Sequence, residues 1–425
     1  MTESGSASGK GKRLIVTGSG PLYGTCRVGT SKNAVLPILA ASLLTREPVI
    51  IRRLPAISDV THMLSLLRIF GASVTMDGRD AVIVTKSIKT TAPASHMVSR
   101  LRASFLFMGP LLAREGSVTM PLPGGCRIGQ RPINLHLAGF KALGARSVII
   151  SGHVHTWGYP LTGAVLCLDY PSVGATENIM MAACTARGTT TIVGAATEPE
   201  VHDLAGFLNA MGARVRISPD GRVVIEGVPE LHGADYTPIP DRIEAGTLMV
   251  AAAASGGDVT LENVRNDHLR PITLKLMEAG AEIFPYPGGV RVIGRRLKPM
   301  VIISSPYPGF PTDLQAPFMA ACCAARGDST INETVFENRF LHVPELQKMG
   351  ADITVAGNTA VVHGGRPLCG AEVTVTDLRA GAALCIAGIL AEGETVLNDI
   401  YHLDRGYEDL EGQLRRLGAN IRRET

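Results

Sequence analysis

The chain has 425 residues, 45% of them hydrophobic, a size typical of two compact domains rather than one. Aromatic residues make up only 4% and the net charge is +3, so a nucleic-acid partner is not expected. No apolar run reaches the roughly 18 residues that a membrane span needs, and residues 1–13 lack the apolar core of a signal peptide. The 8 cysteines form no C-x-x-C pair, which favours reduced thiols and a cytoplasmic location.

A Gly-Ala pair follows an apolar, helix-like stretch six times along the chain. The pairs begin at Gly71, Gly144, Gly212, Gly280, Gly350 and Gly418, with intervals of 73, 68, 68, 70 and 68 residues. A short strand follows each pair, as in GARVRISPDGRVVIEG. Self-similarity at a fixed period predicts one supersecondary unit that is copied and packed against itself.

A second set of helical stretches, rich in small residues, alternates with the first. Each is apolar nearly all round, which predicts a buried helix, and most precede a Gly-containing turn and a strand such as GDVTL or GETVL. Each copy is therefore expected to contain a buried helix, a strand, an amphipathic helix and a β-hairpin. The six stretches are residues 33–44, 102–113, 175–186, 243–254, 313–324 and 377–390.

The sixth copy ends at GANIRRET, before a return strand can form, while residues 13–29 at the other end resemble the missing pieces. The N-terminus is therefore expected to complete the C-terminal half. This predicts one domain of residues 30–239 and a second of residues 1–29 plus 240–425, joined by two chain crossings. Such a connection suits a hinge that closes on a ligand.

The segment from Pro121 to His136 is the least regular stretch. Its prolines and glycines predict a shaped loop rather than a helix or strand. Arg127 and Arg131 flank Cys126, and nearby guanidinium groups favour a reactive thiolate. The alternative is that one of the eight cysteines falls in a loop by chance.

Charged and polar residues also gather where the buried helices start. A helix N-terminus favours anions, so Lys32 and Arg102 are better explained by a negatively charged ligand than by the helix itself. For Ser172, Asp313 and Asp377, simple N-capping is the alternative. Arg339 and Arg405 lie in short loops ahead of amphipathic helices, where a solvated surface position is the default.

Ten segments together resemble one family over essentially the whole chain after Arg13: the UDP-N-acetylglucosamine enolpyruvyl transferases. The resemblance implies an α/β fold of two inside-out α/β prisms (barrels with the helices buried), each made of three βαβαββ units. The segments are SKNAVLPILAASLL, LRASFLFMGPLLAR, LPGGCRIGQRP, PSVGATENIMMAA, EPEVHDLAGFLNAMGA, PDRIEAGT, FPTDLQAPF, ETVFENRFLHVPELQKMGA, TDLRAGAAL and YHLDRGYEDLE.

The resemblance also implies a reaction. The enolpyruvyl group of phosphoenolpyruvate moves to the sugar 3-hydroxyl by addition and elimination, and phosphate is released. Cys126 matches the cysteine that protonates the methylene carbon, and Asp313 the carboxylate at the sugar hydroxyl. Lys32, Arg131 and Arg405 match the cations that hold phosphoenolpyruvate. Neither a cofactor nor a metal is expected.

The remaining matched positions are expected to bind the nucleotide sugar or to complete the site. They are Asn33, Arg102, Pro132, Ile133, Asn134, Leu135, Ser172, Val173, Gly174, Val335, Arg339 and Arg379.

Asn134 stands where the family usually has Asp, and Thr30-Ser31 and Thr197 also depart from its pattern. These departures lie on the acceptor side, so a nucleotide such as UMP, as in nucleoside-antibiotic pathways, is an alternative acceptor. A non-catalytic nucleotide-sugar sensor ranks lower, because both the thiol and the carboxylate are present.

Overall fold

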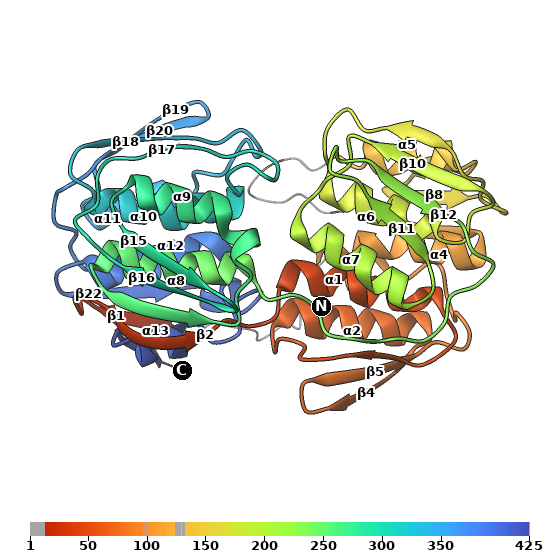
Figure 1. The fold of residues 1–425 in the computed structure, drawn as a ribbon, viewed down its shortest axis with the longest axis horizontal. Helices are drawn as coiled ribbons and strands as arrows, with labels where there is room; N and C mark the ends of the chain where they lie inside the picture. Colours follow the sequence, from red (N-terminus) through yellow and green to blue (C-terminus); the bar gives the residue numbers. More distant parts are fainter. Residues whose placement is uncertain (1–12, 99–100, 124–128, 130–131, 425) are drawn as a thin grey trace, which may run out of the picture. The chain divides into compact units, whose positions relative to one another are not determined.

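The computed structural model describes residues 13–98, 101–123, 129 and 132–424. They divide into two compact units (Figure 1). The N-terminal unit holds the described residues between Thr30 and Ile239, except Gly129. The C-terminal unit holds Gly129, the residues up to Gly29 and those from Pro240 onward.

The N-terminal unit contains strands and helices in alternation. Its strands are β3 (Val49–Ile51), β4 (Ser73–Asp77), β5 (Asp80–Val84), β6 (Ser117–Pro121), β7 (Arg146–Ile150), β8 (His153–Trp157), β9 (Val165–Cys167), β10 (Thr189–Val193), β11 (Arg214–Ile217), β12 (Val223–Glu226) and β13 (Asp235–Tyr236). Its helices are α1 (Lys32–Ala41), η1 (Ser42–Leu44), α2 (Ser58–Phe70), α3 (Ser95–Val98), η2 (Arg102–Phe107), α4 (Met108–Glu115), α5 (Asn134–Ala142), α6 (Val173–Ala183) and α7 (Pro199–Ala210), where η marks a 3₁₀ helix.

The C-terminal unit repeats the alternation. Its strands are β1 (Arg13–Thr17), β2 (Tyr23–Arg27), β14 (Asp258–Glu262), β15 (Glu282–Tyr286), β16 (Gly289–Ile293), β17 (Val301–Ile303), β18 (Asp328–Asn332), β19 (Ile353–Ala356), β20 (Thr359–His363), β21 (Glu372–Thr374), β22 (Glu394–Asn398) and β23 (Asn420–Glu424). Its helices are α8 (Arg242–Ser255), η3 (Asn266–Leu269), α9 (Arg270–Glu278), η4 (Thr312–Leu314), α10 (Gln315–Ala324), α11 (Val343–Lys348), α12 (Leu378–Leu390), η5 (Ile400–His402) and α13 (Leu410–Arg416).

Each unit has three sheets built to one plan. In five of the six sheets a β-hairpin pairs antiparallel with the strand that follows the buried helix, and in the sheet of β22 the strands β1 and β23 take the place of the hairpin. In five of the six sheets a further strand pairs parallel on the outer edge, as β17 does with β18. The described residues give the sixth sheet the order β6-β8-β7. This is the repeated unit that the sequence predicts, and it confirms the α/β fold class.

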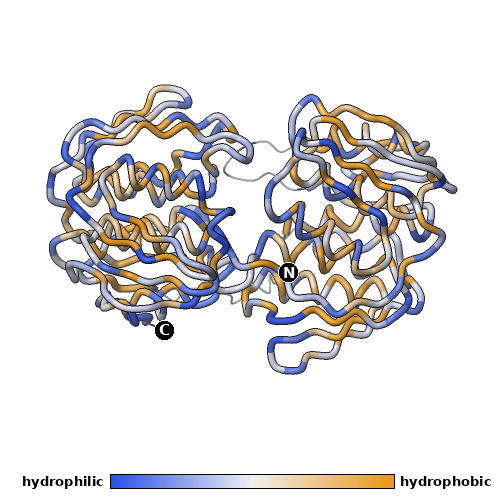
Figure 2. Tube along the Cα trace, viewed as in Figure 1, coloured by the Kyte–Doolittle hydropathy of each residue, from blue (hydrophilic) through white to orange (hydrophobic). Residues whose placement is uncertain are grey.

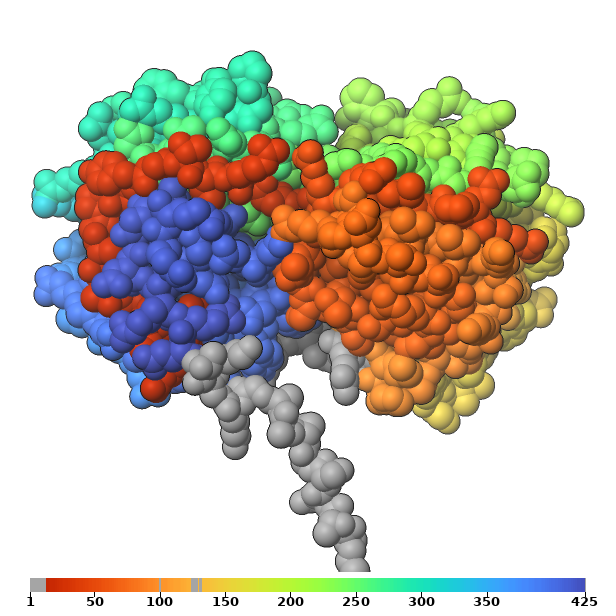
Figure 3. All heavy atoms as spheres, turned by 90° about the horizontal axis from the view of Figure 1, so that it is seen from below, coloured from red at the N-terminus to blue at the C-terminus, as the bar shows by residue number. Residues whose placement is uncertain are grey.

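The N-terminal strand completes the last repeat. β1 lies between β22 and β23 and pairs antiparallel with both, so Val16 is opposite Thr395 and Ile421. Figure 3 shows this contact on the surface, where the first described residues (red) lie against the C-terminal residues (blue). The truncated sixth copy therefore obtains its missing strand from the opposite end of the chain.

The six glycines of the repeat end the six amphipathic helices. All have positive φ, between 87° at Gly350 and 110° at Gly71, a conformation that glycine adopts without steric penalty. The alanine after each glycine donates its N–H to the carbonyl five residues earlier, as Ala145 does to Phe140 at 2.9 Å. This is the hydrogen bond of a Schellman motif, so the Gly-Ala period marks helix ends.

The buried helices form the interior of each unit. In the C-terminal unit α8, α10 and α12 pack on one another, and the hydrophobic residues (orange in Figure 2) follow these helices. Small residues permit the close packing. A Cβ atom at Gly246 would lie 2.5 Å from the side chain of Leu314, and one at Gly109 2.4 Å from the carbonyl oxygen of Asn178. Several candidate site residues lie where these buried helices start, as Lys32 does at α1, Ser172 at α6 and Arg379 at α12.

Candidate active site

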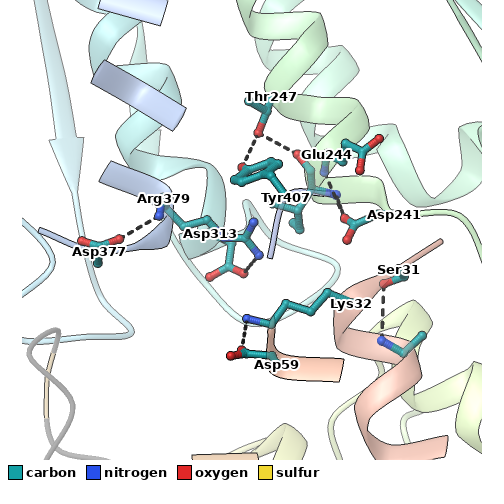
Figure 4. Close-up of polar contacts among 12 residues, drawn as sticks. Ser31, Lys32, Asp59, Asp241, Glu244, Thr247, Asp313, Asp377, Arg379 and Tyr407 are labelled. Atoms are coloured by element: carbon teal, nitrogen blue, oxygen red, sulfur yellow. Dashed lines mark hydrogen bonds and ion pairs between the residues drawn. The ribbon is translucent and has the colours of Figure 1, made fainter. Parts of the chain in front are cut away.

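Lys32 and Asn33 occupy the first turn of α1. Ser31 is the N-cap, and its hydroxyl accepts from the Ala34 N–H at 3.4 Å. The Lys32 ammonium lies 2.7 Å from a carboxylate oxygen of Asp59, and both side chains are largely buried, with exposed fractions of 12% and 6%. A positive charge at a helix N-terminus is unfavourable, and the Asp59 carboxylate compensates it (Figure 4).

A second group of predicted residues lies at the starts of η2, α5 and α6. Arg102 begins η2, and the Ser172 hydroxyl caps α6 by accepting from the Ala175 N–H at 3.4 Å. The N-cap interpretation of Ser172 is therefore confirmed. Val173 and Gly174 form the first turn of α6, and a Cβ atom on Gly174 would lie 3.3 Å from the imidazole of His136.

The irregular stretch is shorter than expected. α5 begins at Asn134, so Asn134, Leu135 and His136 are helical and the prediction of a loop up to His136 is wrong at this end. Ile133 is the N-cap residue and is buried, whereas Pro132 is exposed. Cys126, Arg127 and Arg131 lie outside the described residues, so their predicted roles remain predictions.

Asp313 accepts from two buried arginines of the C-terminal unit. Arg379 Nη2 donates to Oδ2 at 2.7 Å, and Arg339 Nη2 donates to Oδ1 at 3.0 Å (Figure 4 draws the Arg379 pair). The N-cap interpretation of Asp313 is wrong, because α10 begins at Gln315 and has no side-chain cap. A solvated surface position for Arg339 is also wrong, since only 4% of its side chain is exposed.

Arg379 is held between its partners at the start of α12. Asp377 caps this helix, accepting from the N–H groups of Arg379 at 2.8 Å and Ala380 at 3.1 Å, which confirms its N-cap interpretation. Burial alone would lower the pKa of Arg379, but the charge and hydrogen bond of Asp313, together with Tyr407 and Asp241, outweigh burial and the pKa is raised. The guanidinium therefore stays charged, and it lies 5.4 Å from the ring centre of Tyr407.

Arg405 lies in the loop between η5 and α13, and two anchors hold this loop. Thr247 donates its hydroxyl to the Ile243 carbonyl, so the Tyr407 hydroxyl, 2.8 Å away, donates to Thr247. Asp404 accepts two hydrogen bonds from Arg423 of β23, at 3.0 and 2.8 Å. Asp404, directly before Arg405, is therefore fixed to β23, and Tyr407, two residues after Arg405, is fixed to α8.

Glu333 connects Val335 to the Asp313 region. One carboxylate oxygen accepts from the N–H groups of Val335 at 2.8 Å and Phe336 at 3.2 Å. The other accepts from the hydroxyl of Thr312, the residue before Asp313, at 2.9 Å. Glu333 is buried, and its hydrogen bonds hold the backbone at Val335 in place.

The structure thus brings together Asp313, Arg339 and Arg379 in one unit, and His136 with Gly174 in the other. Sequence reasoning missed Asp59, His136, Glu333 and Tyr407. For Asp59, an acidic residue in the first turn of α2 was the available signal, but only the fold brings it to Lys32.

Within the residues that the structure describes, no group of three or more His, Cys, Asp or Glu side chains could hold a metal ion. Among the same residues, no helix is both long and apolar enough to cross a membrane.

Repeated α/β units that carry charged side chains at the starts of buried helices are suited to binding anions, and comparison with known proteins specifies the class. Residues 16–414 match the family described as EPSP synthase (3-phosphoshikimate 1-carboxyvinyltransferase). UDP-N-acetylglucosamine 1-carboxyvinyltransferase 1 of Caldanaerobacter subterraneus subsp. tengcongensis is 52% identical, over 97% of this chain and 99% of the relative. UDP-N-acetylglucosamine 1-carboxyvinyltransferase 2 of Carboxydothermus hydrogenoformans is 49% identical over the same shares. The chain belongs to the 1-carboxyvinyl (enolpyruvyl) transferases.

Solved structures agree with this assignment. The enolpyruvyl transferase NikO from Streptomyces tendae matches with a TM-score of 0.87 and 26% identity, over 98% of this chain and 99% of that chain. An EPSP synthase from Acinetobacter baumannii matches with a TM-score of 0.76 and 19% identity, over 98% and 100%. The second match supports the fold alone.

Proposed function

We propose that this enzyme transfers the enolpyruvyl group of phosphoenolpyruvate to the 3-hydroxyl of UDP-N-acetylglucosamine and releases phosphate, in peptidoglycan precursor synthesis. The observation that carries the proposal is the identity of about half of all residues, over 97% of the chain, with relatives named for this acceptor. Identity to NikO is 26% and to the EPSP synthase 19%. The acceptor of the 52% identical relative is therefore favoured over a nucleotide such as UMP.

In the addition step, the sugar 3-hydroxyl attacks C2 of phosphoenolpyruvate while C3 gains a proton, giving a tetrahedral ketal. In the elimination step, the C–O bond to phosphate breaks and a C3 proton leaves, which restores the double bond. Cys126 is our candidate for the acid that protonates C3. Lys32, Arg131 and Arg405 would bind the carboxylate and phosphate of the donor through charge-assisted hydrogen bonds.

Asp313 is our candidate for the group that accepts the hydroxyl proton. In the structure both of its oxygens accept from guanidinium groups, an arrangement that stabilises the charged carboxylate and weakens it as a base. At least one of these ion pairs would have to loosen when the acceptor hydroxyl arrives. Arg339 and Arg379 then act as positioning residues that hold Asp313 in place until substrate binds.

The test is release of phosphate from phosphoenolpyruvate, measured in parallel with UDP-N-acetylglucosamine, UMP and shikimate 3-phosphate as acceptors. Turnover is expected with UDP-N-acetylglucosamine only. Turnover with UMP alone would overturn the acceptor and leave the enolpyruvyl transfer intact. The absence of turnover with all three would contradict the proposal itself.

The role of Cys126 is tested with a matched pair of variants. Cys126→Ser is expected to abolish most turnover and to remove alkylation by fosfomycin, an epoxide that reacts with thiols. Cys167→Ser is the control, because Cys167 is an exposed cysteine on β9. Undiminished activity of Cys126→Ser would remove this cysteine from the mechanism.

A further inference from the structure

Asn178 is a fully buried amide in the middle of α6. Its Oδ1 accepts from the backbone N–H of Gly109 at 2.7 Å, and its Nδ2 donates to the backbone carbonyl of Phe105 at 3.0 Å. An N–H can only donate and a carbonyl can only accept, so these two contacts determine which end of the amide is oxygen. The amide orientation therefore follows from its backbone partners.

The second N–H of the Asn178 amide faces His136. The distance from Asn178 Nδ2 to His136 Nδ1 is 3.0 Å. Because Nδ2 is a donor, Nδ1 must be the acceptor and carries no proton, which places the single proton of a neutral imidazole on Nε2. Burial and the positive charge of Arg102 lower the pKa of His136 to about 3, in agreement with a neutral ring.

His136 is held rigidly on its other sides as well. Its ring meets Phe105 edge-on, with ring centres 5.1 Å apart and an angle of 87°. Its Cε1 and Nε2 atoms would lie 3.3 and 3.5 Å from a Cβ atom on Gly174, in the first turn of α6. The Nε2 edge therefore lies beside a helix N-terminus, with Arg102 close enough to affect the charge of the ring.

We propose that Asn178 is a positioning residue that holds His136 as the Nε2–H tautomer, and that this N–H donates to a diphosphate oxygen of the nucleotide sugar. Three features favour an anion beside Nε2: the Arg102 guanidinium, the N–H groups of the first turn of α6, and the lack of a side chain at Gly174. The identity of the ligand rests on the proposed function, whereas the tautomer does not.

Because of Asn178, the Nε2–H donor of His136 is present before the ligand binds. A histidine free to choose its tautomer could present a lone pair to the phosphate in part of the population, and a lone pair repels an anion. The buried amide removes that alternative before the ligand arrives. Burying the Asn178 amide costs little stability, because the same amide satisfies two backbone groups of the η2 and α4 segment.

The tautomer is measured directly by nitrogen NMR of the whole enzyme labelled with ¹⁵N-histidine. The His136 signals are assigned by comparison with His136→Gln. The wild-type protein is expected to show protonated Nε2 and unprotonated Nδ1 at neutral pH. In Asn178→Asp, the carboxylate accepts at this position, so the proton is expected on Nδ1. A wild-type Nδ1–H tautomer, or a charged ring, would overturn the proposal.

Kinetics of two His136 variants test the donor even if Asn178→Asp does not fold. Glutamine places an amide N–H near the position of Nε2, whereas asparagine places one near Nδ1. The KM for UDP-N-acetylglucosamine is expected to rise more than about tenfold in His136→Asn and less than about threefold in His136→Gln. The KM for phosphoenolpyruvate should change less than about threefold in both. Equal effects of the two variants on the nucleotide-sugar KM would overturn the proposed donor.

Calorimetric titration with UDP separates this inference from the proposed function. If UDP binds the wild type at least about tenfold more tightly than His136→Asn, the diphosphate contact stands whichever acceptor is turned over. If UDP binds both equally, the contact is refuted even where UDP-N-acetylglucosamine is a substrate.

Discussion

Replacement of Asp313 by asparagine is expected to destabilise the C-terminal unit as well as to impair turnover. The substitution keeps the size of the side chain but removes the negative charge between Arg339 and Arg379. Each arginine is only about 4% exposed, so two guanidinium charges would remain buried and face each other without their shared carboxylate. Breaking a buried ion pair costs about 3 kcal/mol or more, and for a unit of this size that lowers Tm by roughly 6–12 °C.

The assay is thermal unfolding of Asp313→Asn with and without inorganic phosphate. Phosphate is expected to raise the Tm of the variant more than that of the wild type, because an anion can take the place of the lost carboxylate. Asp169→Asn is the control, since Asp169 is exposed and its substitution should leave Tm unchanged.

An unchanged Tm in Asp313→Asn would refute this reasoning. It would mean that the stability of the free enzyme does not depend on a carboxylate between Arg339 and Arg379. An equal effect of phosphate on both proteins would contradict the second step, that these guanidinium groups can bind an anion in its place.

Three further predictions concern pH, positioning and helix ends. Burial and two neighbouring carboxylates raise the pKa of Glu177 well above 4.5, so the free energy of unfolding falls as pH rises above that value. Glu177→Gln should remove up to about 1.4 kcal/mol per pH unit of this dependence. The same pH dependence of the unfolding free energy in both proteins, measured by urea unfolding, would contradict this prediction. Arg423 holds the carboxylate of Asp404, the residue before Arg405, so Arg423→Gln should raise the KM for phosphoenolpyruvate about tenfold. Equal changes in the KM of both substrates would argue against a positioning role. Gly144→Ala should lower the free energy of unfolding by about 1 kcal/mol, through its positive φ alone. Gly71→Ala should lower it more, because the added Cβ would also lie 2.7 Å from a backbone carbonyl oxygen. Equal losses of unfolding free energy in the two variants, measured in urea, would show that this contact is easily relieved.

The repeat was predictable because it depends on local chemistry. A glycine that ends a helix in the left-handed conformation is needed at each copy, and alanine after it closes the same hydrogen bond each time. The buried helices were also predictable, since a helix that is apolar nearly all round has no face for water. The missing strand of the sixth copy pointed to the N-terminus, where β1 is found between β22 and β23.

The partners of the site residues were not predictable in the same way. Asp313 and Arg379 are 66 residues apart, and no pattern in the sequence indicates that they meet. The N-cap interpretation was correct for Ser172 and Asp377 but wrong for Asp313, because a 3₁₀ turn precedes α10 and moves the helix start to Gln315. Because α10 begins two residues after Asp313, this carboxylate does not cap the helix and accepts from Arg339 and Arg379 instead.

The amino-acid sequence by itself determined the repeat, the buried helices, the family resemblance and the types of side chain available for chemistry, because these follow from composition and from spacing along the chain. Only the tertiary structure decided which charges compensate each other and which nitrogen of His136 carries the proton. The reason is that hydrogen bonds and ion pairs depend on distances of about 3 Å between residues far apart in the sequence, and only the packing of the buried helices sets those distances.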